Sequence, residues 1–311
     1  MRLTRSMRPA LALLLLALGS SLGCSTPPST APTPLASAPP AASTVAIAPS
    51  AAPPDDDCVA LGCRLFDTPA DAFRAILETK PLVIAIGEAH AQKGTEAIPS
   101  SAKRFTGELL PLLEGRASDL ILELMAPPAG CKKTTEVVAT KQKVVTEKQT
   151  ESAQSEYVIM GNEAKKRGLV PDLLRPTCAD LDAIDKAGDD AIGASLTTIA
   201  RLTKTKVAQL LDRNAKASPD RLVATYGGAM HNDLAPPPER ALWSFGPELS
   251  ARVKGRYVEI DLFVPEFILE TESWKKLEWY PHFDRTKHPD KTTLFNPHPG
   301  SYVLIFPRTR R

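Results

Sequence analysis

The sequence lacks the short motifs that identify several common enzyme classes. Residues 58–311 contain no GxSxG turn, no phosphate-binding P-loop and no CxxC pair. Their absence leaves little support for a serine hydrolase, a nucleotide-binding protein or a thioredoxin-like redox protein. No single Ser or Cys stands out as a nucleophile for covalent catalysis.

The sequence also lacks a strong charge of either sign. Its 38 Lys and Arg residues are nearly balanced by 36 Asp and Glu residues, which leaves a formal net charge of +2. The basic clusters lie beside acidic residues, as is typical of solvated helix faces. We therefore predict no nucleic-acid partner. Internal repeats of solenoid length are missing too, so residues 58–311 are predicted to form a single domain.

The N-terminal part has the pattern of an export signal. Arg2, Arg5 and Arg8 precede the apolar run ALALLLLALG, which is too short to span a bilayer as a mature helix. The following Leu22-Gly23-Cys24 resembles the lipobox of bacterial lipoproteins. We expect residues 1–23 to be removed and Cys24 to carry a lipid, with ordinary secretion as the alternative.

Residues 24–57 have few large apolar side chains and consist mostly of Ser, Thr, Ala and Pro. Such a composition cannot form a core and predicts a disordered, extended tether. A tether behind a lipid places the domain at the bacterial cell envelope, on the periplasmic or outer-membrane side. The lipid bilayer is then a predicted partner.

Cysteine is rare, with five residues in the chain. Without Cys24 an even number remains, as is typical of an exported protein with disulfides. Of the three possible pairing schemes we favour Cys58 with Cys63 and Cys131 with Cys178. Free buried thiols are the alternative.

Apolar runs alternate with helical patterns along the chain. Strands are predicted at 82–86, 119–125, 221–228, 256–264 and 301–307, and helical stretches at 100–115, 134–166 and 181–215, with weak points at Gly188 and Gly193. This alternation predicts an α/β fold with a mostly parallel or mixed central sheet flanked by helices.

Two of the predicted strands end in the same motif. Gly87-Glu88-Ala89-His90 closes one strand and Gly228-Ala229-Met230-His231 closes another, so both read GxxH. The carboxyl ends of parallel strands line one crevice, so the two histidines are expected to face one pocket. Glycine suits this position because it permits sharp turns and the close approach of a ligand.

Glu123 lies inside the apolar strand LILELM, where a buried carboxylate requires a partner. We expect this partner to be His90 or His231. A position on the polar face of an edge strand is the alternative for Glu123, and a hydrogen-bonded structural role is the alternative for His90.

The series IGEAH, LELM and GGAMH resembles the erythromycin-esterase/ChaN-like superfamily, which also contains the TraB/Tiki proteins. The similarity consists of short islands between about residues 78 and 263. The resemblance implies a mixed α/β core with a site at the strand ends, formed by Glu88, His90, Glu123 and His231. Some members are hydrolases, others are metal-dependent peptidases, and the ChaN branch is associated with haem and iron uptake. Tiki-type members also use an arginine, for which Arg175 is the candidate in substrate binding.

Two classes of function follow, and a structural envelope lipoprotein whose site has decayed is a third possibility. The first is a hydrolase that activates water to cleave an ester, amide or peptide bond, with a Glu–His pair as acid and base. Alternatively, His90, Glu123 and His231 bind Zn²⁺, Mn²⁺ or Fe²⁺, with or without catalysis. A haem- or iron-binding uptake lipoprotein belongs to this second class, although no position matches a haem-ligand motif. In either class the partner is a small molecule or a peptide.

Several further polar residues permit two interpretations. Glu259 and Asp261 alternate with apolar residues, which indicates a strand with one polar face or additional site carboxylates. The remaining histidines, His282, His288 and His298, lie in a segment rich in Pro and aromatic residues. That segment is predicted to be a surface loop or a lid over the strand ends.

Overall fold

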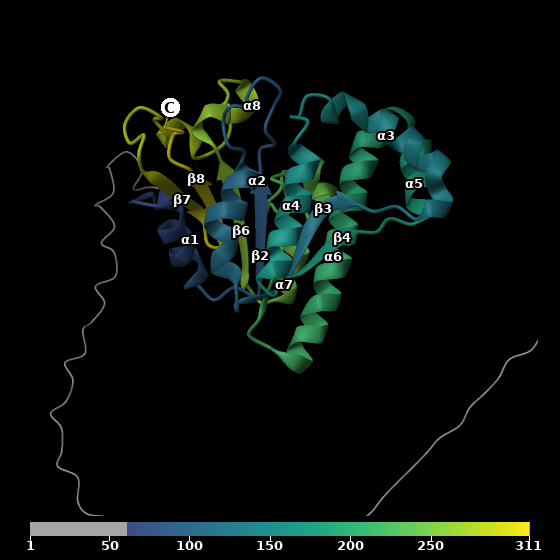
Figure 1. Cartoon of the computed structure of the whole chain (residues 1–311), viewed down its shortest axis with the longest axis horizontal. Coiled ribbons are helices and arrows are strands. Elements are labelled where there is room, and N and C mark those ends of the chain that lie inside the picture. The colour runs from purple at the N-terminus through teal and green to yellow at the C-terminus, as the bar shows by residue number, and fades with distance from the viewer. Residues whose placement is uncertain (1–60, 311) are drawn as a thin grey trace, which may run out of the picture. The chain divides into compact units, whose positions relative to one another are not determined.

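The central feature of the fold is an eight-stranded sheet, seen in a computed structural model that describes residues 61–310 (Figure 1). The strand order is β1-β7-β8-β6-β2-β5-β3-β4. Within the part β8-β6-β2-β5-β3-β4, all neighbouring strands are parallel. The strand β7 is antiparallel to both β8 and β1. The strands are β1 Arg64–Phe66, β2 Val83–Glu88, β3 Ala117–Met125, β4 Val170–Leu174, β5 Leu222–Gly228, β6 Tyr257–Phe263, β7 Thr292–His298 and β8 Ser301–Ile305.

Helices cover both faces of this sheet, and the predicted α/β class is therefore confirmed. One apolar core lies between the sheet and the layer that contains α1 and α4, and a second core lies under α6 and α7. The helices are α1 Pro69–Leu77, α2 Ser101–Arg104, α3 Lys132–Thr146, α4 Ala153–Lys166, α5 Cys178–Lys186, α6 Ala191–Ala217, α7 Gly246–Arg252 and α8 Glu272–Lys275.

The helical stretch predicted at 100–115 begins where expected but is not a regular α-helix. Ser100 caps α2, because its hydroxyl accepts a hydrogen bond from the backbone N–H of Lys103. A π-helical turn (Phe105–Leu109) and a 3₁₀ turn (Leu110–Leu113) follow. Pro111 has no N–H for an α-helical hydrogen bond, which accounts for the irregular end.

The predicted helical stretch 181–215 divides at Gly188, where φ is +60°. Glycine adopts this conformation without steric cost, so α5 ends before it. The other predicted weak point, Gly193, lies inside α6.

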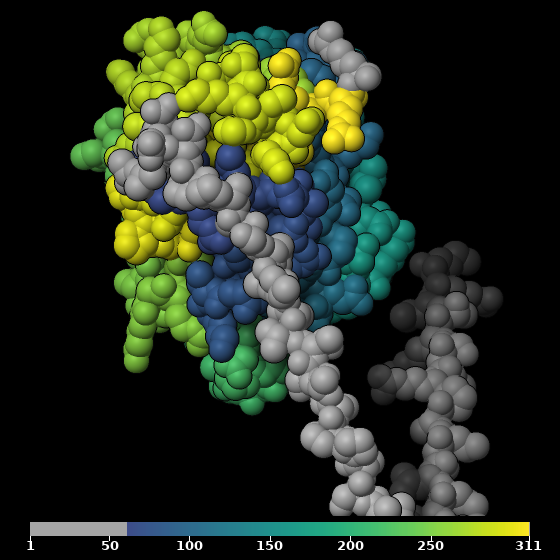
Figure 2. Space-filling model, turned by 90° about the vertical axis from the view of Figure 1, so that its left-hand side faces the viewer, coloured from purple at the N-terminus to yellow at the C-terminus, as the bar shows by residue number. Residues whose placement is uncertain are grey.

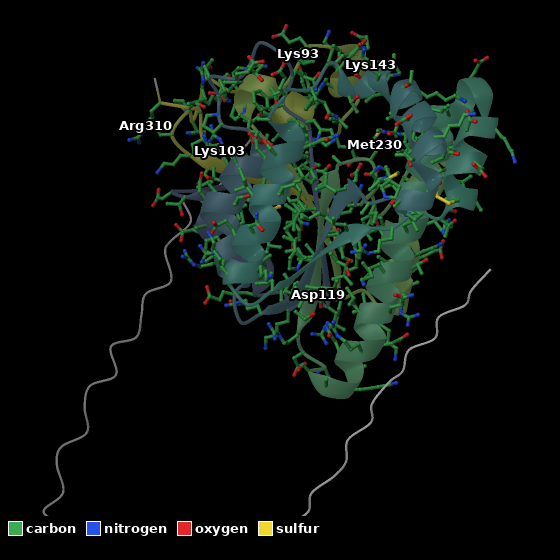
Figure 3. All side chains as sticks on the ribbon, turned by 45° about the vertical axis from the view of Figure 1, so that its right-hand side comes forward. Lys93, Lys103, Asp119, Lys143, Met230 and Arg310 are labelled. Atoms are coloured by element: carbon green, nitrogen blue, oxygen red, sulfur yellow. A yellow bond between two sulfur atoms is a disulfide. The ribbon has the colours of Figure 1, made fainter. Side chains whose placement is uncertain are left out.

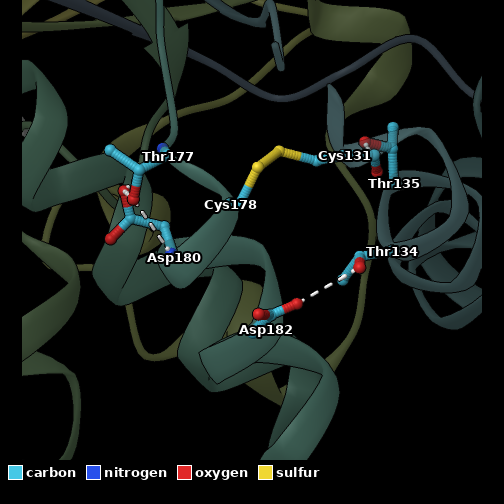
Figure 4. Close-up of a disulfide and its surroundings, with 7 residues drawn as sticks. All are labelled: Cys131, Thr134, Thr135, Thr177, Cys178, Asp180 and Asp182. Atoms are coloured by element: carbon cyan, nitrogen blue, oxygen red, sulfur yellow. Dashed lines mark hydrogen bonds between the residues drawn. A yellow bond between two sulfur atoms is a disulfide. The ribbon is translucent and has the colours of Figure 1, made fainter. Parts of the chain in front are cut away.

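Helices α3 and α5 form a small lobe beside the sheet, and a disulfide joins them (Figure 4). Cys131 and Cys178 have their Cα atoms 5.5 Å apart, and this predicted pairing is confirmed. The hydroxyl of Thr134 also donates to Asp182 across the lobe, at 3.2 Å. Cys63 is buried, but Cys58, its predicted partner, lies outside the described residues. The predicted signal, Cys24 and the tether lie outside them as well.

The segment after β2 is bonded to the connection between α3 and α4. The backbone N–H of Lys93 donates to the carbonyl oxygen of Lys148, and the N–H of Thr150 donates to Ala91. An antiparallel bridge between Gln92 and Gln149 lies between these two bonds. The short ladder fixes the chain next to His90.

The segment between β6 and β7 packs through aromatic side chains. Trp279 lies within 5.2–6.1 Å, between ring centroids, of Phe263, Trp274, Phe283 and Phe295. In Figure 2 the yellow-green atoms that follow β6 form the upper part of the visible face. His282 lies in this packed segment, and the segment is therefore not an unstructured loop. No helix within residues 61–310 has both the length and the apolar character needed to cross a membrane.

Candidate functional site

The candidate site lies where β2, β5 and β3 end side by side (Figure 1). Glu88 is the last residue of β2 and pairs in register with Gly228, the last residue of β5. Glu123 comes from β3, the next strand in the sheet, and His90 and His231 follow their strands within three residues. The parallel topology therefore brings together three segments that are far apart in sequence, with Glu88 and His90 on one of them. Figure 3 shows Met230, which precedes His231, well away from Asp119 near the start of β3.

Glu88 is a buried carboxylate with three hydrogen-bond donors. Its Oε1 accepts from the hydroxyl of Tyr157 at 3.0 Å and lies 2.9 Å from Nδ1 of His90. Its Oε2 accepts from the hydroxyl of Tyr226 at 2.7 Å. These contacts hold Glu88 as an acceptor that orients the ring of His90, and they leave it little freedom to act on a ligand itself.

His90 is the more accessible of the two histidines, with 27% of its side chain exposed. Because Nδ1 faces Glu88, Nε2 is the ring nitrogen on the side of Gly228. Burial lowers the pKa of His90, but the hydrogen bond and charge of Glu88, together with the charge of Glu123, outweigh burial and raise the pKa to about 9.

His231 is buried, and its ring is fixed at both nitrogens. Nδ1 donates to the carbonyl oxygen of Trp243 at 2.7 Å, which assigns the proton to Nδ1, and Nε2 faces Oε1 of Glu123 at 3.5 Å. Burial lowers the pKa of His231, and the charge and hydrogen bond of Glu123 overcome this effect, so the pKa is raised.

Glu123 lies between the two imidazoles. Its Oε2 accepts from the backbone N–H of Gly228 at 2.6 Å. Burial raises the pKa of Glu123, but the nearby His231 and His90 and the N–H of Gly228 lower it to about 2. The strand β3 has a neighbour on each side, so Glu123 is not on an edge strand.

Gly87 of the first motif and Gly227, which precedes the second motif, permit close packing. Neither Gly87 nor Gly228 has a positive φ, so a sharp turn is not the reason for glycine here. A Cβ on Gly87 would lie 2.6 Å from Cα of Ala229 and 2.7 Å from the side chains of Asn232 and Asp261. A side chain on Gly227 would collide with the carboxylate of Glu123.

Gly228 marks the space that the site residues share. A Cβ there would lie 3.5 Å from Nε2 of His90, 3.7 Å from Oε2 of Glu123 and 4.0 Å from Cδ2 of His231. These are ordinary van der Waals distances, so the three side chains leave room for one carbon-sized atom beside Gly228.

Glu259 and Asp261 share one face of β6, but that face is covered by protein. Glu259 accepts from the backbone N–H of Leu234 at 2.7 Å, and Asp261 accepts from the side-chain amide of Asn232 at 3.0 Å. Burial is the main cause that raises the pKa of Glu259 to about 7 and the pKa of Asp261 well above its usual range. Both carboxyl groups hold the segment after His231 and do not bond to the Glu/His cluster.

The other predicted residues lie elsewhere. Arg175 is exposed at the end of β4, the edge strand, and is not part of the hydrogen-bonded network around Glu88 and Glu123. His298 lies 3.4 Å from Glu278 on the surface, at the end of β7.

The two imidazoles and Glu123 have the chemistry of a divalent transition-metal site. In each histidine, Nδ1 also donates a hydrogen bond to an oxygen, from Glu88 for His90 and from the carbonyl group of Trp243 for His231. Metal-bound histidines usually have such a partner. Within residues 61–310, however, no three His, Cys, Asp or Glu side chains are spaced to hold a metal ion. As arranged, the residues form two His–carboxylate pairs.

Four groups that form hydrogen bonds in and around the site could not be predicted from the motifs: Tyr157, Tyr226, Asn232 and the carbonyl group of Trp243. Tyr226 offers one signal, since a tyrosine in a buried strand requires a partner for its hydroxyl. Comparison of the chain with protein-family models, curated proteins and solved structures gives no match, so the resemblance to the erythromycin-esterase/ChaN-like superfamily rests on the motifs alone.

Proposed function

We propose that this protein is a membrane-tethered, extracytoplasmic hydrolase that activates water to cleave an ester, amide or peptide bond. One observation carries the proposal: two imidazoles, each held at Nδ1, direct Nε2 toward the space around Glu123 and Gly228. Two positioned groups of this kind can take a proton from water and give one to a leaving group.

The exposure of the two histidines suggests their roles. His90 is accessible, so its neutral ring takes a proton from water at Nε2 while the water oxygen attacks the carbonyl carbon of the substrate. The imidazolium of His231, held by Glu123, gives its Nε2 proton to the leaving oxygen or nitrogen as the bond to carbon breaks. Proton exchange with solvent then returns both rings to their starting states.

The raised pKa of His90 gives the proposal a pH dependence. The base is the neutral ring, and with a pKa of about 9 most of His90 is protonated at neutral pH. Because the acid is the protonated ring of His231, whose pKa is raised as well, kcat/KM for a cleaved substrate should rise about tenfold per pH unit while both rings are protonated and fall once both rings are neutral. A profile without a rising limb would contradict a histidine base.

Gly228→Ala provides a sharp test of the shared space. The added methyl group fits without collision, so the fold should remain, but the methyl group occupies the space between His90, Glu123 and His231. In a screen of ester, amide and peptide substrates we expect a loss of roughly 10²-fold or more in kcat/KM, as for removal of a general base by His90→Gln.

Gly107→Ala is the matched control, because Gly107 has open space around its Cβ position and lies away from the site. It should keep full activity. A protein that cleaves none of the three substrate classes, or a fully active Gly228→Ala variant, would refute the proposal.

The second candidate is a metal-binding protein without turnover. It is favoured by the fixed Nδ1 atoms of His90 and His231, which leave two Nε2 atoms and the carboxylate of Glu123 as ligands. Metal analysis of the purified protein distinguishes the candidates. One bound Zn, Mn or Fe per chain that is lost in both His90→Ala and His231→Ala, without any hydrolysis, would favour binding alone.

A further inference from the structure

A small pocket lies behind Glu123 and His231, on the side of α6. Its polar lining comes from these two residues and from Thr203, Thr225 and Asn232, and its walls are isoleucine and phenylalanine side chains. The pocket volume of about 10 Å³ matches the room that one buried water requires.

Asn232 contributes an acceptor that the protein leaves unsatisfied. The residue is 1% exposed, and its Oδ1 has no hydrogen-bond partner among the described residues. Leaving a buried amide oxygen without a donor is unfavourable, so a donor is expected beside it.

Reversing the side-chain amide of Asn232 does not remove this requirement. Nδ2 donates to the carbonyl oxygen of Ala85 at 3.3 Å and to Oδ1 of Asp261 at 3.0 Å. A reversed amide would place its oxygen against the carbonyl oxygen of Ala85. The observed orientation is therefore fixed, and Oδ1 is the atom left over.

We infer that this pocket binds one water molecule, which donates a hydrogen bond to Oδ1 of Asn232. Glu123, His231 and the two threonines line the same pocket and provide the two to four polar partners that buried waters usually have. The 3.5 Å separation between Nε2 of His231 and Oε1 of Glu123 makes a weak hydrogen bond, so both atoms retain capacity to bond to a water. The inference requires no catalysis and holds whichever proposed function is correct.

A crystal structure of the wild-type protein at high resolution tests the inference. We expect one density peak about 2.7–3.2 Å from Oδ1 of Asn232. An ordered pocket without a peak, a reversed Asn232 amide bonded to Asp261, or an anomalous signal that identifies the peak as a metal ion would each overturn the inference.

A pair of variants locates the water. Thr203→Ile extends a side chain into the pocket, whereas Thr205→Ile makes the same change on an exposed turn of α6. The peak should disappear in Thr203→Ile and remain in Thr205→Ile. A peak that persists in Thr203→Ile would overturn the assignment to this pocket. Should that variant fail to fold, the wild-type structure decides alone.

Discussion

At the scale of single residues, the site depends on how Glu88 is held. Two tyrosine hydroxyls satisfy its carboxylate, and these donors weaken its effect on the ring of His90. The GxxH motifs predicted that both histidines lie at one edge of the sheet and face one pocket. They could not predict the tyrosines, because Tyr157 comes from a helix with no motif, nor the acceptor of His231, because a backbone carbonyl has no sequence signature.

Tyr226→Phe tests this arrangement. With one donor fewer, Glu88 attracts a proton on His90 more strongly, so we expect the pKa of His90 to rise further in an NMR titration. The free energy of unfolding should fall by about 1–3 kcal/mol, because a buried oxygen loses its partner. Tyr302→Phe, at a half-buried tyrosine of β8, serves as control. An unchanged pKa of His90 would show that Tyr226 does not act through Glu88.

The raised pKa of His90 also predicts how stability varies with pH. A group whose pKa is raised from 6.5 to about 9 stabilises the fold fully below pH 6.5, and this contribution is lost as the pH rises through 9. We expect this contribution of His90 to lower the free energy of unfolding by about 3 kcal/mol across that window. The fall should be smaller by this amount in His90→Gln when both proteins are unfolded with urea at each pH, and the part that remains comes from His231, whose pKa is raised as well. Parallel curves for the two proteins would contradict the prediction.

At the scale of elements, apolar runs identified the strands at the centre of the sheet but missed those at its margins. The strands β2, β3, β5, β6 and β8 coincide with predicted runs because both of their faces are buried. In contrast, β4 has the sequence VPDLL, in which a proline and an aspartate mask a short edge strand. The strand β7 contains Pro297 and lies in the segment that the sequence predicts to be a surface loop or a lid. The order of strands depends on long-range pairing, which periodicity does not report.

The disulfide gives a prediction for the lobe of α3 and α5. Cys131 and Cys178 are 47 positions apart, and closing such a loop stabilises a fold by up to about 4 kcal/mol. We expect a reductant, or the paired change of both residues to Ser, to lower the free energy of unfolding by 2–4 kcal/mol. Hydrogen exchange should increase in α3 and α5 while β2 and β5 stay protected. Uniform loss of protection across the sheet would show that the lobe is not an independent unit.

At the scale of the whole molecule, we predict that a lipid on Cys24 attaches the protein to the membrane. Palmitate labelling in cells should depend on Cys24, and Cys24→Ala should move the protein from the membrane fraction to the soluble fraction. Cys63→Ser controls for loss of a cysteine in the folded part. If Cys24→Ala remains in the membrane fraction, the lipoprotein prediction is wrong.

The short ladder between Ala91–Lys93 and Lys148–Thr150 has a consequence for how a ligand binds. A loop that becomes ordered only around its ligand loses conformational entropy at that moment, which weakens binding. Here the chain beside His90 is already ordered by backbone hydrogen bonds in the free protein. Ligand association should therefore be a one-step process, with an observed rate that increases linearly with ligand concentration and shows no plateau from a slow loop closure.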